Sequence, residues 1–127
     1  MKIILVRHGQ TKENLHKILQ GGRIGGTLSQ KGVEDTEKLG AWMLENNINI
    51  EVIFCSDLNR TRQTLEILKQ YIKCPKIYFT SKLREQDFGD WTGKKYDENV
   101  CLDIKDVFNR ALRAEEDKYK HWNSIKG

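Results

Sequence analysis

The sequence has no long apolar run, and this absence excludes two classes of protein. No window approaches the roughly 20 apolar residues that a membrane-spanning helix needs, so we expect no membrane partner. The apolar run Ile3–Val6 near the amino terminus is followed at once by charge and is too short for the apolar region of a signal peptide. We therefore expect a cytoplasmic protein.

Cysteine and concentrated charge are also scarce. The three cysteines, Cys55, Cys74 and Cys101, are odd in number and fit no metal-binding spacing, which favours reduced thiols over a disulfide framework. The 22 Lys and Arg residues against 18 Asp and Glu leave a net charge of +4, which suits anionic ligands such as phosphate esters; solubility alone would also explain it. Because no basic stretch alternates with aromatic residues, we expect no nucleic-acid partner.

An apolar run that stops at Arg7-His8-Gly9 is the most informative stretch of the chain. Its mostly β-branched residues Ile3–Val6 predict a strand that is buried on both faces, as in a parallel sheet. Arg7 and His8 then follow the carboxyl end of that strand, where open α/β sheets place their ligands. Gly9 would let the backbone turn closely past a bound group.

The next elements continue an α/β pattern. Ser29 is placed to cap a helix that runs to about Asn46, and we expect Trp42 and Met43 in its core face. Residues 52–55 and 77–79 predict two more strands. Between them, Asp57 or Asn59 is placed to cap a helix that carries Arg60 in its first turn. A cation there opposes the helix dipole, so Arg60 suggests a bound anion such as phosphate.

Two other phosphate chemistries fail on spacing. The glycine-rich stretch 20–29 has Thr27-Leu28 where a Walker loop requires Lys and Ser or Thr, so we expect a flexible loop there. A cysteine-dependent phosphatase needs five residues between its Cys and Arg, whereas four separate Cys55 from Arg60 and six separate it from Arg62. Cys55 is best interpreted as a small core residue.

Three segments together resemble the histidine phosphatase superfamily, also called the phosphoglycerate mutase-like family. They are Arg7-His8-Gly9 with Gln10, Thr11 and Asn14; Ser56-Asp57-Leu58 with Arg60, Gln63 and Thr64; and Leu83 and Glu85 followed by Phe88-Gly89, Trp91 and Gly93. The resemblance implies an α/β fold with a mostly parallel sheet and helices on both faces. It also implies a phosphatase that acts on a small phosphate ester without metal or cofactor.

The resemblance also assigns roles to five residues. It implies that His8 is the phosphorylated nucleophile, that Arg7, Asn14 and Arg60 bind the phosphate, and that Glu85 protonates the leaving group. The glycines and aromatics around Glu85 predict tight turns and a partly dry site, which would favour a proton-donating carboxyl. Other interpretations stay open: Asn14 as a capping residue, Glu85 in a surface ion pair, and Asp87 or Asp90 as weaker acids.

A second active-site histidine, which the family carries in a later Ser/Thr-His-Gly segment, has no counterpart in these 127 residues. Neither His16 nor His121 stands in such a segment. We therefore expect a single domain, 1–127, that resembles the amino-terminal two-thirds of a family member, is truncated at its carboxyl end and has an incomplete sheet. Residues 94–122 are expected to form a helical insertion that shapes substrate choice.

Three consequences of this incomplete pattern stay open. The unpaired sheet edges predict self-association or a partner that supplies the strand. A phosphatase is preferred, with phosphoglycerate mutase-type phosphoryl transfer as the first alternative. The second is a non-catalytic phosphate-binding or interaction domain, or an inactive fragment.

Overall fold

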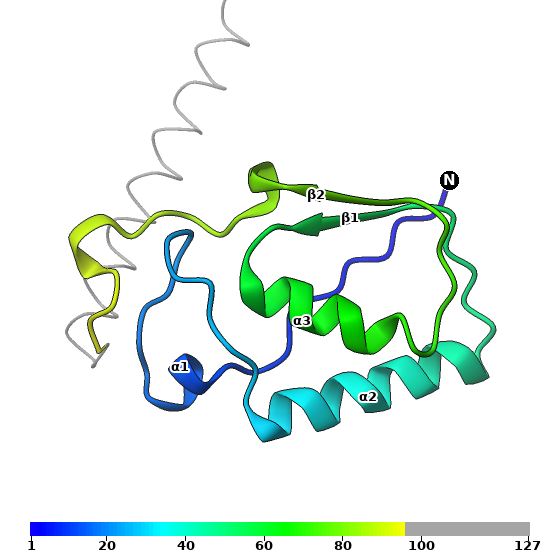
Figure 1. Ribbon diagram of the computed structural model, residues 1–127, viewed down its shortest axis with the longest axis horizontal. Coiled ribbons are helices and arrows are strands. Elements are labelled where there is room, and N and C mark those ends of the chain that lie inside the picture. The colour runs from blue at the N-terminus through cyan, green and yellow to red at the C-terminus, as the bar shows by residue number, and fades with distance from the viewer. Residues whose placement is uncertain (96–127) are drawn as a thin grey trace, which may run out of the picture. The chain divides into compact units, whose positions relative to one another are not determined.

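The computed structural model describes residues 1–95, which form one compact unit (Figure 1). The predicted insertion 94–122 falls almost entirely outside the described residues. The elements in chain order are α1 (Lys12–Leu15), α2 (Gln30–Glu45), β1 (Ile53–Ser56), α3 (Asn59–Leu68), β2 (Ile77–Thr80) and the short 3₁₀ turns η1 (Ser81–Leu83) and η2 (Gly89–Trp91).

The strands β1 and β2 form a parallel pair, in register from Ile53 opposite Ile77 to Ser56 opposite Thr80. A parallel pair needs a crossover, and α3 supplies it. The α/β class and the parallel pairing are therefore confirmed. One face of the pair carries Phe54 and Tyr78, whose rings stack 5.5 Å apart and whose residues are 63% and 53% exposed, so no helix of residues 1–95 covers that face.

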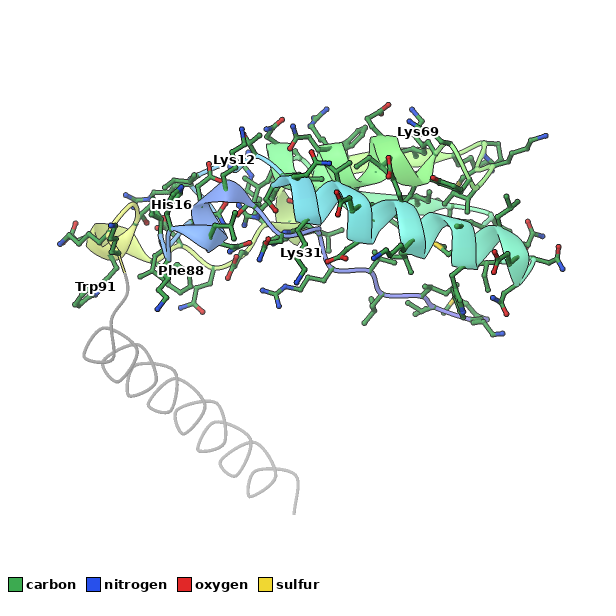
Figure 2. The ribbon with its side chains drawn as sticks, turned by 90° about the horizontal axis from the view of Figure 1, so that it is seen from below. Lys12, His16, Lys31, Lys69, Phe88 and Trp91 are labelled. Carbon is green, nitrogen blue, oxygen red and sulfur yellow. The ribbon has the colours of Figure 1, made fainter. Side chains whose placement is uncertain are left out.

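On the other face, α3 packs against β1 and α2 packs against α3, as Figures 1 and 2 show. Met43 of α2, Leu68 of α3 and Ile72 form the buried centre of this layer. Ser29 caps α2 as predicted, because its Oγ accepts the amide hydrogen of Gly32. Gly40 meets the ring of Tyr71 so closely that a Cβ atom would clash.

The prediction that Trp42 lies in the core is wrong, because this residue is 54% exposed. The buried positions of α2 are Gly32, Thr36, Gly40 and Met43, which recur at intervals of three and four residues. Each residue turns the helix by about 100°, so Trp42 lies about 200° around from Gly40. Only Met43 of the predicted pair faces α3.

The predicted strand Ile3–Val6 is also wrong. The segment forms no ladder with either strand, and its four residues are 43% to 92% exposed. An apolar run becomes a buried strand only where a neighbouring strand accepts its backbone groups, and β1 pairs with β2 alone. Figure 1 shows this amino-terminal segment as a coil apart from the β1 arrow.

Gly9 is where the chain joins the packed unit. Its amide donates to Thr64 Oγ1 at 3.0 Å. A Cβ atom on Gly9 would lie 2.8 Å from both the carbonyl oxygen of Gly32 and Thr36 Oγ1. The glycine is therefore required for close packing against α2, a reason that differs from the predicted approach to a ligand. His8 stands at this junction.

Candidate active site

A cavity of about 410 Å³ opens at the carboxyl end of β1. Four of the five predicted site residues line it: Arg7 and His8 from the amino-terminal segment, Arg60 from α3, and Glu85 from the segment between η1 and η2. The remaining lining residues are Val6, Ser56, Leu58, Thr61 and Leu83. Positions that are 78 residues apart in the chain, from Arg7 to Glu85, thus share one site.

Arg60 is the most buried side chain of the site, at 2% exposure. Its Nη1 donates to the carbonyl oxygen of Ile24 at 2.6 Å, and its Nη2 donates to that of Gly21 at 3.0 Å. Nη2 also contacts Glu85 Oε2 at 3.1 Å. Burial lowers the pKa of Arg60, while Glu85 and Glu13 oppose that change. The loop 21–25 therefore fixes the guanidinium, and Glu85 supplies its anionic partner.

Glu85 is more open to solvent than predicted. Its side chain is 50% exposed, so the expected partly dry environment is not present among residues 1–95. The predicted turns are there, since Gly89 and Gly93 adopt φ angles of 56° and 82°. Phe88 and Trp91, however, are not among the residues that line the cavity.

His8 has a defined ring orientation. Its Nδ1 lies 2.7 Å from the carbonyl oxygen of Gly9. A carbonyl can only accept, so the neutral ring carries its proton on Nδ1 and keeps the lone pair on Nε2. Burial is the largest influence on this ring and lowers its pKa, an effect that Arg60 and Arg7 reinforce and that Gly9 and Glu85 oppose. The neutral, nucleophilic form is favoured.

Comparison with known proteins identifies the family. Residues 3–122 match the model of the histidine phosphatase superfamily, branch 1. The chain belongs to this superfamily. Its relatives include a broad-specificity phosphatase of Saccharomyces cerevisiae, 34% identical over 91 residues, which are 70% of this chain and 39% of that protein. A probable phosphoglycerate mutase of Salmonella choleraesuis is 37% identical over 89 residues, which are 70% of this chain and 40% of that protein.

Solved structures of the superfamily have the same fold. Bacillus stearothermophilus YhfR matches with a TM-score of 0.62 at 34% identity, over 77% of this chain and 46% of that one. The chain thus spans about half the length of the relatives it matches, compared with the expected two-thirds.

Asn14, the fifth predicted site residue of this superfamily member, does not line the cavity. It completes a capping box at the start of α1: its Oδ1 accepts from the Thr11 amide, and its own amide donates to Thr11 Oγ1, both at 3.0 Å. The capping interpretation therefore holds for the described structure. Because capping uses the oxygen, Nδ2 keeps its hydrogens for a ligand.

Sequence reasoning missed the role of Asp57. Neither Asp57 nor Asn59 caps α3; the cap position is Leu58, without a side-chain bond. Asp57 instead forms a two-pronged ion pair with Arg84, at 2.7 Å from Nε and 2.6 Å from Nη2. Arg84 lowers the pKa of Asp57. The charge of Arg84, directly before the predicted acid Glu85, was the signal that could have indicated this contact.

Two further contacts hold the Glu85 segment. The Gly22 amide donates to the Gln86 carbonyl at 3.0 Å, and Arg23 pairs with Asp87 at 2.8 Å. Asp87 thus has a partner outside the cavity, and Asp90 is not among the lining residues. Neither weaker acid candidate reaches the site in the described structure.

The other histidines and the cysteines lie apart from this chemistry. His16 ends α1 and is exposed (Figure 2), and His121 falls outside the described residues. Cys55 is buried, and burial raises the pKa of its thiol. Within residues 1–95, no three His, Cys, Asp or Glu side chains are close enough to hold a metal ion, and no helix is long and apolar enough to cross a membrane.

Proposed function

We propose that this protein is a phosphatase that hydrolyses a small phosphate ester through a phosphohistidine at His8. The observation that carries the proposal is that His8, Arg7, Arg60 and Glu85 line one cavity. The relatives support phosphatase chemistry in general, because they include phosphatases and phosphoglycerate mutase-like proteins. Neither metal nor cofactor is needed for the steps below.

In the first step, His8 Nε2 attacks phosphorus in line with the departing oxygen. The P–N bond forms as the P–O bond breaks, and Glu85 gives its proton to the leaving alcohol. Arg7 and Arg60, which line the cavity, hold the equatorial oxygens, so the charge that develops there meets fixed donors; Asn14, outside that lining, stays a predicted third donor through its Nδ2. In the second step, water attacks phosphorus and gives one proton to the Glu85 carboxylate, the P–N bond breaks with its electron pair returning to His8 Nε2, and inorganic phosphate leaves.

Phosphoglycerate mutase-type transfer is the first alternative, and the similarity to a probable phosphoglycerate mutase favours it. A mutase returns the phosphoryl group to a second oxygen before water can intervene. A phosphatase is preferred because the relatives include a broad-specificity phosphatase. Substrate profiling separates the two: phosphate release without product isomerisation indicates a phosphatase.

A non-catalytic phosphate-binding domain or inactive fragment is the second alternative, because the 127 residues include no second His-Gly segment. We propose that this chain by itself binds phosphate but turns over slowly. Loss of one charge-stabilising donor typically costs about 10²- to 10³-fold in rate. An ordinary phosphatase rate in the isolated chain would overturn this part of the proposal.

Acid-labile phosphate labelling tests the nucleophile. We expect a family-length protein that contains this segment to become labelled by a phosphate ester, and His8→Ala to abolish both labelling and hydrolysis of p-nitrophenyl phosphate. His16→Ala is the matched control, because His16 is exposed and lies outside the cavity lining. Labelling that survives in His8→Ala would sink the assignment.

We also propose that the chain associates with a second copy through its open edge. The support is the exposed apolar segment Ile3–Val6 and the free edge of β1, which pairs only with β2 among the described strands. Light scattering should show oligomers of the wild-type chain. The substitution Leu5→Lys should dissociate them into monomers, since Leu5 is 92% exposed. A protein that stays monomeric at every concentration would overturn self-association. Of the two expected ways to complete the sheet, only a partner protein that supplies the strand would then remain.

A cytoplasmic location is part of the same proposal. Cys55 and Cys74 form no disulfide in the described structure, which agrees with a reducing compartment. When the protein is purified without reductant and then denatured, thiol titration should count three free cysteines. A lower count would argue for oxidation.

A further inference from the structure

The hydrogen bonds of Arg60 leave almost no room for a ligand. Nη1 donates to Ile24 and, at 3.4 Å, to the Gly25 carbonyl, and one hydrogen of Nη2 goes to Gly21. The backbone amide of Arg60 is also taken, by the Gly25 carbonyl at 2.9 Å. The guanidinium is therefore held mostly by main-chain acceptors, which belong to the fold and do not leave easily.

Glu85 is the exception among the partners of Arg60. It is a side chain, it is half exposed, and it contacts Nη2 through one oxygen only. The Nε of Arg60 is buried and has no partner in the described structure. A phosphoryl group that enters the cavity can thus gain from Arg60 the Nη2 donor that Glu85 occupies.

We propose that an incoming phosphoryl group replaces the Glu85 carboxylate on Arg60 and that the displaced carboxylate takes up one proton. The inference rests on the proposed function and deepens it. An anionic ligand removes the cation from Glu85 and brings a negative charge beside it, and both changes favour the neutral carboxyl. The proton comes from the buffer, and the O–H bond formed is the one later given to the leaving alcohol.

This exchange explains how an open, ion-paired glutamate acts as an acid. In the ligand-free site Glu85 is charged and neutralises Arg60; with ligand bound, the phosphoryl group neutralises Arg60 and Glu85 carries the proton. The charged and titratable groups that line the cavity with Glu85 are Arg60 from α3, which contacts it, and Arg7 and His8 from the amino-terminal segment. Arg84 is engaged by Asp57, so it does not take over as the partner of the free carboxylate.

Sulfate is the suitable probe, because it stays a dianion across the working pH range and needs no turnover. Calorimetric titration in two buffers of different ionisation enthalpy measures the protons taken up per sulfate bound. His8 also gains protons beside a dianion, so Glu85→Gln is compared with the wild type: the difference belongs to Glu85. Asp87→Asn is the matched control, since it removes one negative charge from the same segment but does not touch Arg60.

We expect Glu85→Gln to bind sulfate at least about tenfold more tightly than the wild type at neutral pH, since one neighbouring charge typically shifts a titration by a unit or more. The wild-type affinity should fall as pH rises, by up to about tenfold per unit more than that of the variant, because one proton is bound with the ligand. Asp87→Asn should keep the wild-type slope.

The possible results distinguish the exchange at Glu85 from the anion site itself. Sulfate binding with equal affinity and equal proton uptake in wild type and Glu85→Gln overturns the exchange and leaves the anion site standing. No sulfate binding by either protein overturns the anion site of the proposed function, and the exchange with it. An Asp87→Asn variant that reproduces the Glu85→Gln result would show a general charge effect and would also overturn the exchange.

Discussion

Arg84 and Asp57 join the end of β1 to the segment that carries Glu85. The two nitrogen–oxygen contacts, at 2.7 and 2.6 Å, are parallel and short, the geometry in which an arginine and a carboxylate bind most specifically. The neighbours of this pair, Ser56 and Leu58 on one side and Glu85 on the other, line the cavity, whereas the pair itself does not. It is therefore placed to position Glu85 from outside.

The first prediction follows from this position. In a family-length protein, Asp57→Asn should slow hydrolysis of an alkyl phosphate, whose leaving group needs a proton, more than that of p-nitrophenyl phosphate, whose leaving group does not. Small displacements of a catalytic group cost up to about 10²-fold, so a tenfold or larger difference is reasonable. Glu66→Gln, which breaks the exposed pair with Lys69, is the control. Equal losses on both substrates would indicate a structural effect only.

The second prediction concerns the pH dependence of His8. Burial lowers its pKa, so an NMR titration of its Cε1 proton should give a midpoint below the ordinary value of about 6.5. The unfolded chain then binds the proton more readily than the folded one. His8 should therefore reduce folding stability as pH falls through 6.5 toward the folded midpoint, and His8→Gln should remove that part of the acid sensitivity. A midpoint at or above 6.5 would contradict the burial argument.

The third prediction tests the core between α2 and α3. Met43 is 3% exposed and its neighbour Leu44 is 59% exposed. Truncation of a buried methionine typically costs about 2 to 5 kcal/mol, so Met43→Ala should strongly lower the free energy of unfolding in urea. Leu44→Ala offers a matched control of similar size and should change it little. Similar losses in both variants would contradict the assignment of Met43, and not Leu44, to the core.

The fourth prediction concerns Gly40. In an open helix, Gly→Ala is stabilising by roughly 1 kcal/mol, but here a Cβ atom would collide with the Tyr71 ring. Overpacking typically costs about 1 to 3 kcal/mol, so Gly40→Ala should destabilise the protein. In a Tyr71→Ala background the same substitution should be neutral or favourable. Thermal unfolding of the four proteins measures this coupling, and additive effects would rule out the contact.

Local patterns predicted most of the described fold. The helices around Met43 and Arg60 and the two paired strands follow from periodicity and from polar residues at their ends. The segment Ile3–Val6 has an equally good strand pattern, but a strand also needs a partner, which no local pattern supplies. Trp42 directly precedes the buried Met43, and the rotation of about 100° between neighbouring helical residues turns Trp42 away from the core.

The site was predicted as a set of residues but not as a set of contacts. Arg7, His8, Arg60 and Glu85 do share a cavity. The way the loop 21–25 wraps the guanidinium depends on backbone carbonyls, which every residue has. Sequence patterns carry no record of which carbonyl an arginine meets.

The close approach of Gly9 to Gly32 has a consequence for tolerance to mutation. A Cβ atom on Gly32 would collide with the Gln10 carbonyl, and one on Gly9 would meet the Gly32 carbonyl, although neither glycine has a positive φ angle. In saturation mutagenesis scored by folding alone, with no substrate present, both positions should reject even alanine. The glycine of the Arg-His-Gly signature would then behave as a packing position, and its loss would register as low protein abundance before any loss of chemistry.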